Sequence, residues 1–263
     1  MRTSLNGIGL TLPIGRQMTG RVQSIQIAVP RWETADGSPD PAARPWRSGI
    51  FKAPVMGSVR LGWYNLEGDG QADVVHHGGV DKAVCAYSSE HWRHWQPILP
   101  PGQSRAGAFG ENFTVESLTE SDVCIGDVFS IGTAVVQVSQ PRQPCWKLAR
   151  RWRMKDLAVQ MEQTGYTGWY FRVLREGEVA ACQLLQLLDR PHPEWTVAAA
   201  NRIMHHERTN RDAAGCLSEC RAISSSWRQT MEQRARIHVA SDPQLRQFGK
   251  GSPTPDASSQ EGL

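Results

Sequence analysis

Residues 139–148 read SQPRQPCWKL, and this stretch holds the side chain with the clearest chemical potential in the chain. Its two prolines fix φ, and the second disfavours helix in the residue before it, so a stiff, extended connector is predicted just after a strand. The thiol of Cys145 lies between the cations Arg142 and Lys147, which favour the thiolate, the form that ligates soft metals. We predict that Cys145 is a metal ligand; a buried structural cysteine is the alternative.

A second candidate is the histidine pair in DVVHHGGVDKAV, residues 73–84. The two glycines that follow allow a tight turn or a close approach of the backbone to a ligand. Neighbouring residues of a strand face opposite sides, so His76 and His77 are not expected to chelate one metal together. His77, beside Gly78, is the candidate proton donor, and Asp81 could orient or replace it. A hairpin with surface histidines is the alternative.

A third candidate is Asn112 in GAFGENFTV, residues 107–115. Its amide carries donors and an acceptor, so it could bind a heterocycle or an anion, and a simple Asn/Gly turn is the alternative. Upstream, the basic residues Lys52 and Arg60 are candidates for binding a phosphate. Solvated surface positions are the commoner case for such side chains.

Composition narrows the class of protein. The chain has 263 residues, 40% of them apolar, and a formal charge of +3, which is too small to argue for a nucleic-acid polymer as partner. No stretch approaches the ~20 apolar residues of a membrane span, and the N-terminus is a poor secretory signal. The six cysteines include no CxxC pair, which favours reduced thiols and a cytoplasmic location. GxGxxG, P-loop, HExxH, haem and ferredoxin motifs are absent.

Short strand patterns separated by glycine and aspartate turns dominate the chain up to DRPHPEW. They predict a mainly β fold, a closed or nearly closed barrel with peripheral helices, over residues 20–190. Residues 191–240 predict a small extension of three short helices, with Thr196 and the serines at 224–226 as N-caps. Residues 241–263 are rich in glycine, serine and proline and are predicted to be disordered.

Three long motifs together carry a resemblance: LEGDGQADVVHHGGVDKAVCAY, GAFGENFTVESLTESDVCIGDVFSIG and VSQPRQPCWKLARRW. In this order they closely resemble the MOSC family, named for the C-terminal domain of molybdenum-cofactor sulfurases. The text DRPHPEWTVAAANRIMHH, followed by AISSSWRQTMEQR, resembles the three-helix extension of its stand-alone YiiM-type members. The resemblance covers about residues 20–235.

The resemblance implies a MOSC-type β-barrel that binds a molybdopterin cofactor, with Cys145 as the molybdenum ligand. Arg142 matches an arginine of the same family segment, His77 and Gly78 match its His-Gly-Gly, and Asn112 matches its Gly-Glu-Asn. Lys52 lies in the familiar GIFKAPV, so a contact with the cofactor phosphate is implied there, and Arg60 is carried beside it.

The same resemblance implies an enzyme that reduces N-hydroxylated compounds, such as hydroxylaminopurine-like base analogues, to amines. Electrons would come from a separate flavoprotein or other reductase, and a homodimer is left open. One alternative is a non-catalytic molybdopterin carrier. The other is a sulfur carrier with a persulfide on Cys145, although sulfurases also need a pyridoxal-phosphate domain, for which this chain is too short.

Overall fold

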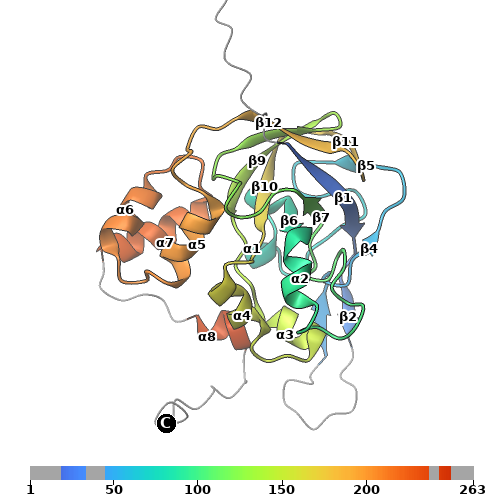
Figure 1. Ribbon diagram of the computed structural model, residues 1–263, viewed down its shortest axis with the longest axis horizontal. Helices are drawn as coiled ribbons and strands as arrows, with labels where there is room; N and C mark the ends of the chain where they lie inside the picture. Colours follow the sequence, from blue (N-terminus) through green and yellow to red (C-terminus); the bar gives the residue numbers. More distant parts are fainter. Residues whose placement is uncertain (1–18, 34–44, 237–242, 250–263) are drawn as a thin grey trace, which may run out of the picture.

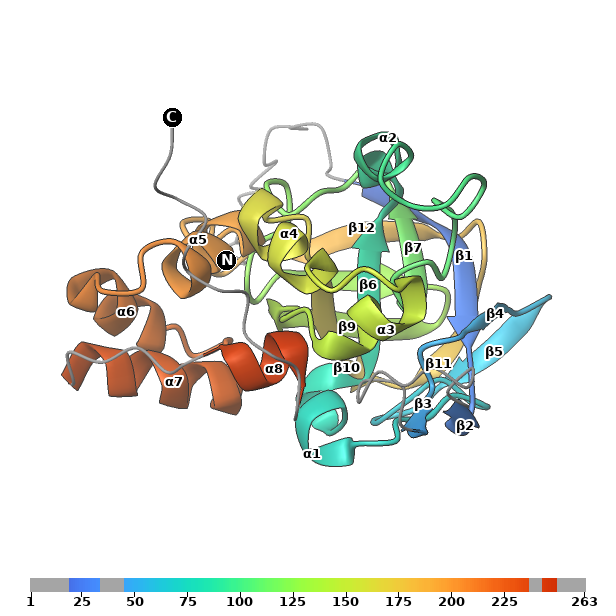
Figure 2. The same ribbon diagram turned by 90° about the horizontal axis from the view of Figure 1, so that it is seen from below.

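The computed structural model describes residues 19–33, 45–236 and 243–249 (Figure 1). The poor signal-like segment at the N-terminus and most of the segment predicted to be disordered lie outside these residues. A barrel and a separate group of helices beside it make up the molecule, as the two views show (Figures 1 and 2). The predicted architecture, a mainly β barrel with peripheral helices and a small C-terminal helical extension, is confirmed.

Seven strands close the barrel, because the first pairs with the last as well as with its other neighbour. All neighbours are antiparallel except β6 and β7, which run parallel. In spatial order the strands are β1 (Thr19–Ile27), β12 (Leu184–Asp189), β8 (Val128–Ile131), β9 (Ala134–Pro141), β10 (Trp169–Arg175), β6 (Val84–Ser88) and β7 (Phe113–Glu116).

Short strands decorate this barrel. The strand β11 (Gly177–Ala180) follows β10 directly but pairs with β5 (Ser58–Leu61), with Glu178 opposite Arg60. The additional strands are β4 (Ala53–Pro54), which extends β1, β5 (Ser58–Leu61) with β11 (Gly177–Ala180), and β2 (Arg31–Glu33) with β3 (Trp46–Ser48).

Apolar alternation along the strands fills the barrel. Phe113, Phe129 and Phe171 are fully buried, and edge-to-face packing joins the last two at 6.0 Å between ring centroids. The same core cluster runs without interruption into the helical extension, where it includes Trp227 and Met231. Because the two parts share one apolar core, the extension is docked on the barrel and not tethered beside it.

Short helices cover one end of the barrel. They are α1 (Val74–His77), α2 (Trp92–Trp95), α3 (Trp146–Trp152) and α4 (Leu157–Thr164), with the 3-10 turns η2 (Val80–Lys82) and η3 (Ser89–His91). Gly165 ends α4 in the left-handed conformation. A second buried cluster, which includes Trp95, Phe109 and Leu148, packs beneath these helices.

The extension consists of α5 (Val197–His205), α6 (Arg211–Ser218) and α7 (Ser225–Arg236). Thr196 caps α5, since its side chain accepts a hydrogen bond from the Ala199 amide at 3.0 Å. Ser224 does the same at α7, accepting from the Trp227 amide at 3.3 Å. Both predicted caps are confirmed.

One further helix, α8 (Gln244–Phe248), lies in the segment that composition predicted to be disordered. Its polar side chains reach Glu162 of α4: Arg246 Nη1 lies 2.5 Å from Oε1, and Gln247 Nε2 lies 2.7 Å from Oε2. His205 of α5 approaches the same carboxylate, with Nδ1 at 3.3 Å. Glu162 therefore joins three helices. None of the helices in the described ranges is long and apolar enough to cross a membrane.

The Glu162 carboxylate predicts a pH-dependent stability. Burial raises its pKa, but the His205 and Arg246 contacts outweigh burial and lower the pKa from 4.5 to about 2. A lowered carboxyl pKa contributes stability that is complete above the unfolded-state pKa and is lost as the pH falls toward the folded-state pKa. Glu162→Gln is expected to reduce the unfolding free energy at pH 7 by about 2 kcal/mol.

Urea unfolding at a series of pH values measures this effect. The difference between wild type and Glu162→Gln should shrink as the pH falls below 4.5 toward 2, the window set by the two pKa values. A difference that stays constant across that window contradicts the assignment.

Candidate active site

The Cys145 thiol is placed by the junction between β9 and α3. The chain leaves the sheet at Pro141 and stays extended through Cys145, whose φ of −135° and ψ of 167° make it the N-cap of α3. The predicted stiff connector is therefore present, and α3 follows it directly, which the sequence analysis did not foresee. The thiol does not cap the helix, and Cys145 is only 7% exposed. Its sulfur is thus free to face a partner from another loop.

That partner is His77, whose Nε2 lies 3.8 Å from the Cys145 Sγ. His77 is the last residue of α1, so the histidine pair lies in a short helix, and the alternative of a surface hairpin is wrong. The helix forms because Asp73 accepts a hydrogen bond from the His76 amide at 3.0 Å. His76 itself turns outward, with Nδ1 2.9 Å from the same carboxylate. Only one of the two histidines therefore reaches the thiol.

Two glycines close α1. A side chain at Gly78 would place its Cβ 3.0 Å from the Val74 carbonyl oxygen, so the turn would have to shift slightly to accept one. Gly79 has a φ of 91°, which other residues rarely adopt. These two constraints explain why the His-Gly-Gly run holds His77 at the mouth of the site.

Two cations flank the pair. Arg142 is buried, and its Nη2 donates to the Phe109 carbonyl at 2.7 Å. Its Nη1 is also buried but has no hydrogen-bond partner in the described part of the chain. Lys147 is buried too, and its ammonium lies 5.9 Å from the Trp146 ring, with no ion pair to any described residue. The site therefore offers an anion two cationic groups.

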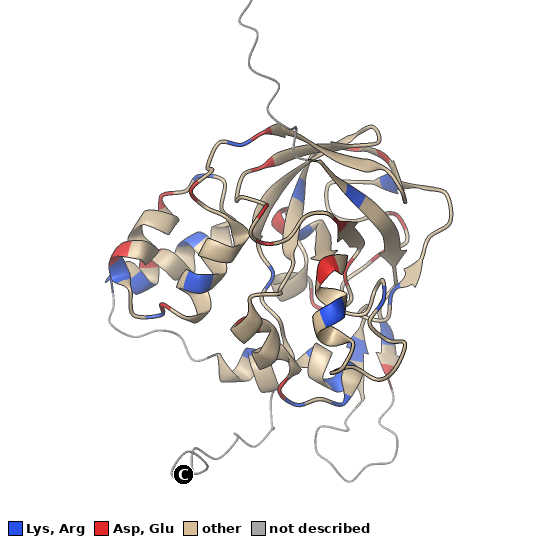
Figure 3. Cartoon of the chain, viewed as in Figure 1, with Lys and Arg blue, Asp and Glu red and all other residues tan. Residues whose placement is uncertain are grey.

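Other basic residues of α3 are already engaged. Arg150 lies over the Trp146 ring at 4.7 Å, and Arg151 Nη1 donates to the Ile50 carbonyl at 2.5 Å. Figure 3 shows the basic positions gathered along α3 and the turn after it. Lys147 differs from its neighbours because it combines burial with the lack of a described anionic partner.

This surplus of positive charge acts on His77. Burial and the nearby charge of Lys147 lower the pKa of the imidazole from 6.5 to about 3, Asp73 opposes the shift, and Arg142 and Lys82 add to it. The imidazole is therefore neutral at pH 7 in this structure. As a neutral ring it carries one N–H and one lone pair, so it can accept a proton from a neighbouring group.

Behind Arg142 lie two groups that the sequence analysis did not select, Cys85 of β6 and Tyr170 of β10, which face each other in register. Burial raises the pKa of the Cys85 thiol, while Arg142 and Lys52 act to lower it. Burial and the neighbouring Cys85 likewise raise the pKa of Tyr170. Both groups stay protonated at neutral pH, so they do not balance the charge of Arg142, on which the buried Glu111 carboxylate acts from a distance without an ion pair.

Lys52 and Asn112 meet at a third residue, Asp69, which the sequence analysis did not select. Lys52 forms an ion pair with the buried Asp69 carboxylate, and Asn112 Nδ2 donates to it at 2.9 Å. Asn112 Oδ1 accepts from the Cys85 amide at 3.1 Å, and Nδ2 also lies 3.2 Å from the Gln26 carbonyl. Protein partners thus occupy the whole Asn112 amide. The predicted cofactor contacts of both residues remain predictions.

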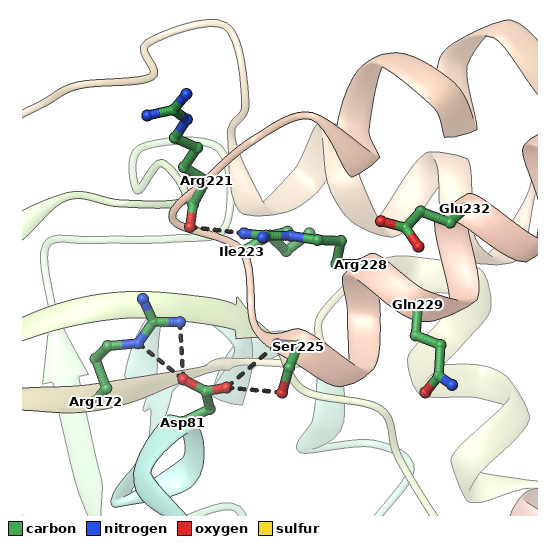
Figure 4. A pocket seen from close by; sticks show the side chains of 8 residues that line it. All are labelled: Asp81, Arg172, Arg221, Ile223, Ser225, Arg228, Gln229 and Glu232. Carbon is green, nitrogen blue, oxygen red and sulfur yellow. Dashed lines mark hydrogen bonds and ion pairs between the residues drawn. The ribbon is translucent and has the colours of Figure 1, made fainter.

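Arg60 and Asp81 lie elsewhere. Arg60 is exposed on β5 and pairs with Glu176 at 3.1 Å. Asp81 points to the junction between barrel and extension, where Arg172 Nη2 lies 2.8 Å from its carboxylate and the Ser225 amide donates at 3.3 Å (Figure 4). This junction borders a cavity of about 400 Å³. The predicted roles of both residues stay untested, and the geometry gives Asp81 a docking contact.

A closed seven-stranded barrel and a helical extension define the class of protein, and comparison with known proteins agrees. Residues 73–183 match the MOSC domain, and residues 195–236 match the YiiM-like, 3-alpha helix domain. The chain belongs to the MOSC domain family, and its extension places it among the YiiM-like members. The matches lie inside the predicted ranges 20–190 and 191–240.

Individual relatives support this assignment. The protein YflK of Bacillus subtilis (strain 168) is 50% identical over 191 residues, which cover 72% of this chain and 86% of YflK. The crystal structure of YiiM from Geobacillus stearothermophilus is similar with a TM-score of 0.68 at 40% identity, over 82% of this chain and 99% of that one. A protein named Reductase from Gibberella moniliformis (strain M3125 / FGSC 7600) is 34% identical over 176 residues, 66% of this chain and 31% of its own length.

The electrostatics of the site predict that His77 stays neutral. Nitrogen-15 NMR of the imidazole should show no protonation of His77 between about pH 5 and 8. Lys147→Ala should raise its pKa, because the lysine charge opposes protonation, whereas the exposed Lys155→Ala should leave it unchanged. Titration of wild-type His77 near 6.5 would show that the buried positive charge does not act on it.

Proposed function

We propose that this protein is a molybdenum-cofactor-dependent reductase of N-hydroxylated compounds. The observation that carries the proposal is the Cys145 thiol, 3.8 Å from the neutral His77 imidazole and flanked by two buried cations. Membership of the MOSC family supports it, and so does the relative that is named Reductase.

The residues present fit such a cofactor. The unpartnered Nη1 of Arg142 and the unpaired Lys147 supply donors for a phosphate, and charge-assisted hydrogen bonds are the strong ones. Within the described ranges no three His, Cys, Asp or Glu side chains gather to hold a metal on their own. A single soft thiolate, Cys145, suits a metal that arrives with its other ligands already in place.

The overall reaction takes up two electrons and two protons, breaks the N–O bond, and yields the amine and water. When bound, the molybdenum cofactor supplies the electrons and accepts the oxygen. The protein's part is to bind, orient and move protons. On binding the cofactor, the Cys145 thiol would lose its proton, and Nε2 of His77, 3.8 Å from the sulfur, would be the acceptor within reach. In each turnover both protons would come from water, and His77 would pass one of them to the departing oxygen, with the negative charge of the cofactor phosphate favouring the transient imidazolium.

Substrate and electron donor follow from the same proposal. The proposed substrate is a small N-hydroxylated compound of the hydroxylaminopurine class, which rests on the family resemblance. The sequence carries no flavin, haem or iron–sulfur motif, so the electrons are assigned to a separate reductase, a flavoprotein or another class. The Asp69 network of Lys52 and Asn112 borders Cys85 and is proposed to hold the second wall of the cofactor site.

The Cys145–His77 contact also favours a second candidate, sulfur transfer. A thiolate activated by a neighbouring base is a nucleophile, and it could take sulfane sulfur from a donor persulfide, which leaves as its thiol, and pass that sulfur to an acceptor thiolate. Mass spectrometry of protein purified without reductant distinguishes the two. A persulfide on Cys145 together with no reduction of hydroxylaminopurine would select the carrier.

The direct test of the reductase is metal content. Wild type and Cys145→Ala are expressed without oxygen in a host that makes the cofactor. Bound molybdenum should fall by about tenfold or more in the variant, since mutation of residues that only hydrogen-bond to a metal's ligands already lowers metal affinity by that factor. Cys216→Ala removes an exposed thiol of α6 and should retain the metal. Equal molybdenum in wild type and Cys145→Ala would remove the ligand assignment.

Activity provides a second readout. With a chemically reduced dye as electron donor, wild type and Cys216→Ala should convert a hydroxylaminopurine to the aminopurine. Cys145→Ala should not. A metal-loaded wild type that forms no amine with any dye would favour a carrier over an enzyme.

A further inference from the structure

The helix α8 lies against the segment that presents Cys145. It contacts α3, and the backbone at Gly249 lies so close that an added Cβ would be 3.2 Å from Cγ of Trp146. Trp146 is the residue after Cys145. The last helix of the extension, α7, ends at Arg236, and α8 lies beside α4 on the barrel side (Figure 1).

Arg246 makes the contact that matters most. Its Nη1 donates to the backbone carbonyl of Pro144, and the same nitrogen lies 2.5 Å from Glu162 Oε1. Pro144 has no N–H of its own. Its carbonyl is part of the peptide bond to Cys145. The guanidinium therefore binds the backbone directly before the proposed ligand.

Glu162 fixes the guanidinium in turn. The carboxylate is buried and receives Gln247 at 2.7 Å and His205 at 3.3 Å. A continuous chain of contacts therefore runs from α5 of the extension through α4 and α8 to the Pro144–Cys145 peptide. None of these groups belongs to the site itself.

We propose that α8 is a C-terminal clasp, in which Arg246 is the positioning residue that holds the buried Cys145 beside His77. This role goes beyond the proposed reduction and applies to the protein with or without cofactor. A helix of five residues is not stable alone, because forming the first turn is unfavourable and so short a helix adds too few hydrogen bonds to offset it. The clasp is thus held by its contacts, and losing them frees the Cys145 segment.

The accessibility of the Cys145 thiol tests the clasp. The full-length protein, without cofactor, is treated with iodoacetamide, and alkylation of each cysteine is followed by peptide mass spectrometry. Arg246→Ala should speed alkylation of Cys145 by about five- to thirtyfold, the range that a small loss of local stability produces. The exposed Cys216 serves as the internal reference and should react at an unchanged rate.

Two variants separate positioning from general destabilisation. Leu245→Ala alters an exposed residue of the same helix and should leave Cys145 as slow as in wild type. Arg246→Lys keeps one charged donor and should restore part of the protection. The proposal is overturned if Arg246→Ala reacts like wild type, or if Leu245→Ala accelerates Cys145 equally.

Discussion

The rest of the site depends on one backbone constraint, the extended run that ends at Cys145 before α3 begins. The residue has the φ and ψ of a strand, while its carbonyl oxygen already accepts a hydrogen bond from the Leu148 amide, 3.0 Å away, in the first turn of the helix. A thiol at that corner projects out of the helix and sheet alike. It meets His77 because Gly78 and Gly79 close a helix of one turn at the required place.

Positive charge is the second feature of this corner, and together with burial it explains the state of the imidazole. Burial is the largest cause of the lowered pKa of His77, and the charges of Lys147 and Arg142 add to it. Neither cation forms an ion pair with a described carboxylate, and the buried Glu111 acts on Arg142 only from a distance. An anionic ligand would relieve the imbalance. The site thus has an excess of positive charge that an anionic ligand would balance, and a cofactor that carries a phosphate is such a ligand.

Sequence reasoning selected Cys145 and His77 because prolines, glycines and neighbouring charges restrict each of them locally, and it selected Arg142 as a cofactor contact through the family resemblance. It could not foresee Asp69, which joins Lys52 and Asn112 although it lies 17 positions from the first and 43 from the second along the chain. Short helices were not predicted for a related reason. A helix of four residues is about one turn long, so its apolar pattern cannot be distinguished from that of a strand. The clasp was hidden because the composition of its segment predicts disorder, while its contacts with Glu162 are tertiary.

The barrel itself was predictable, since alternating strands and turn residues repeat along the chain, whereas its closure between β1 and β12 is a long-range pairing. The central claim, that the sulfur of Cys145 binds molybdenum, is tested most directly by X-ray absorption at the molybdenum edge of the loaded protein. The account predicts that the number of sulfur neighbours falls by one in Cys145→Ser. An unchanged sulfur shell in that variant would contradict it.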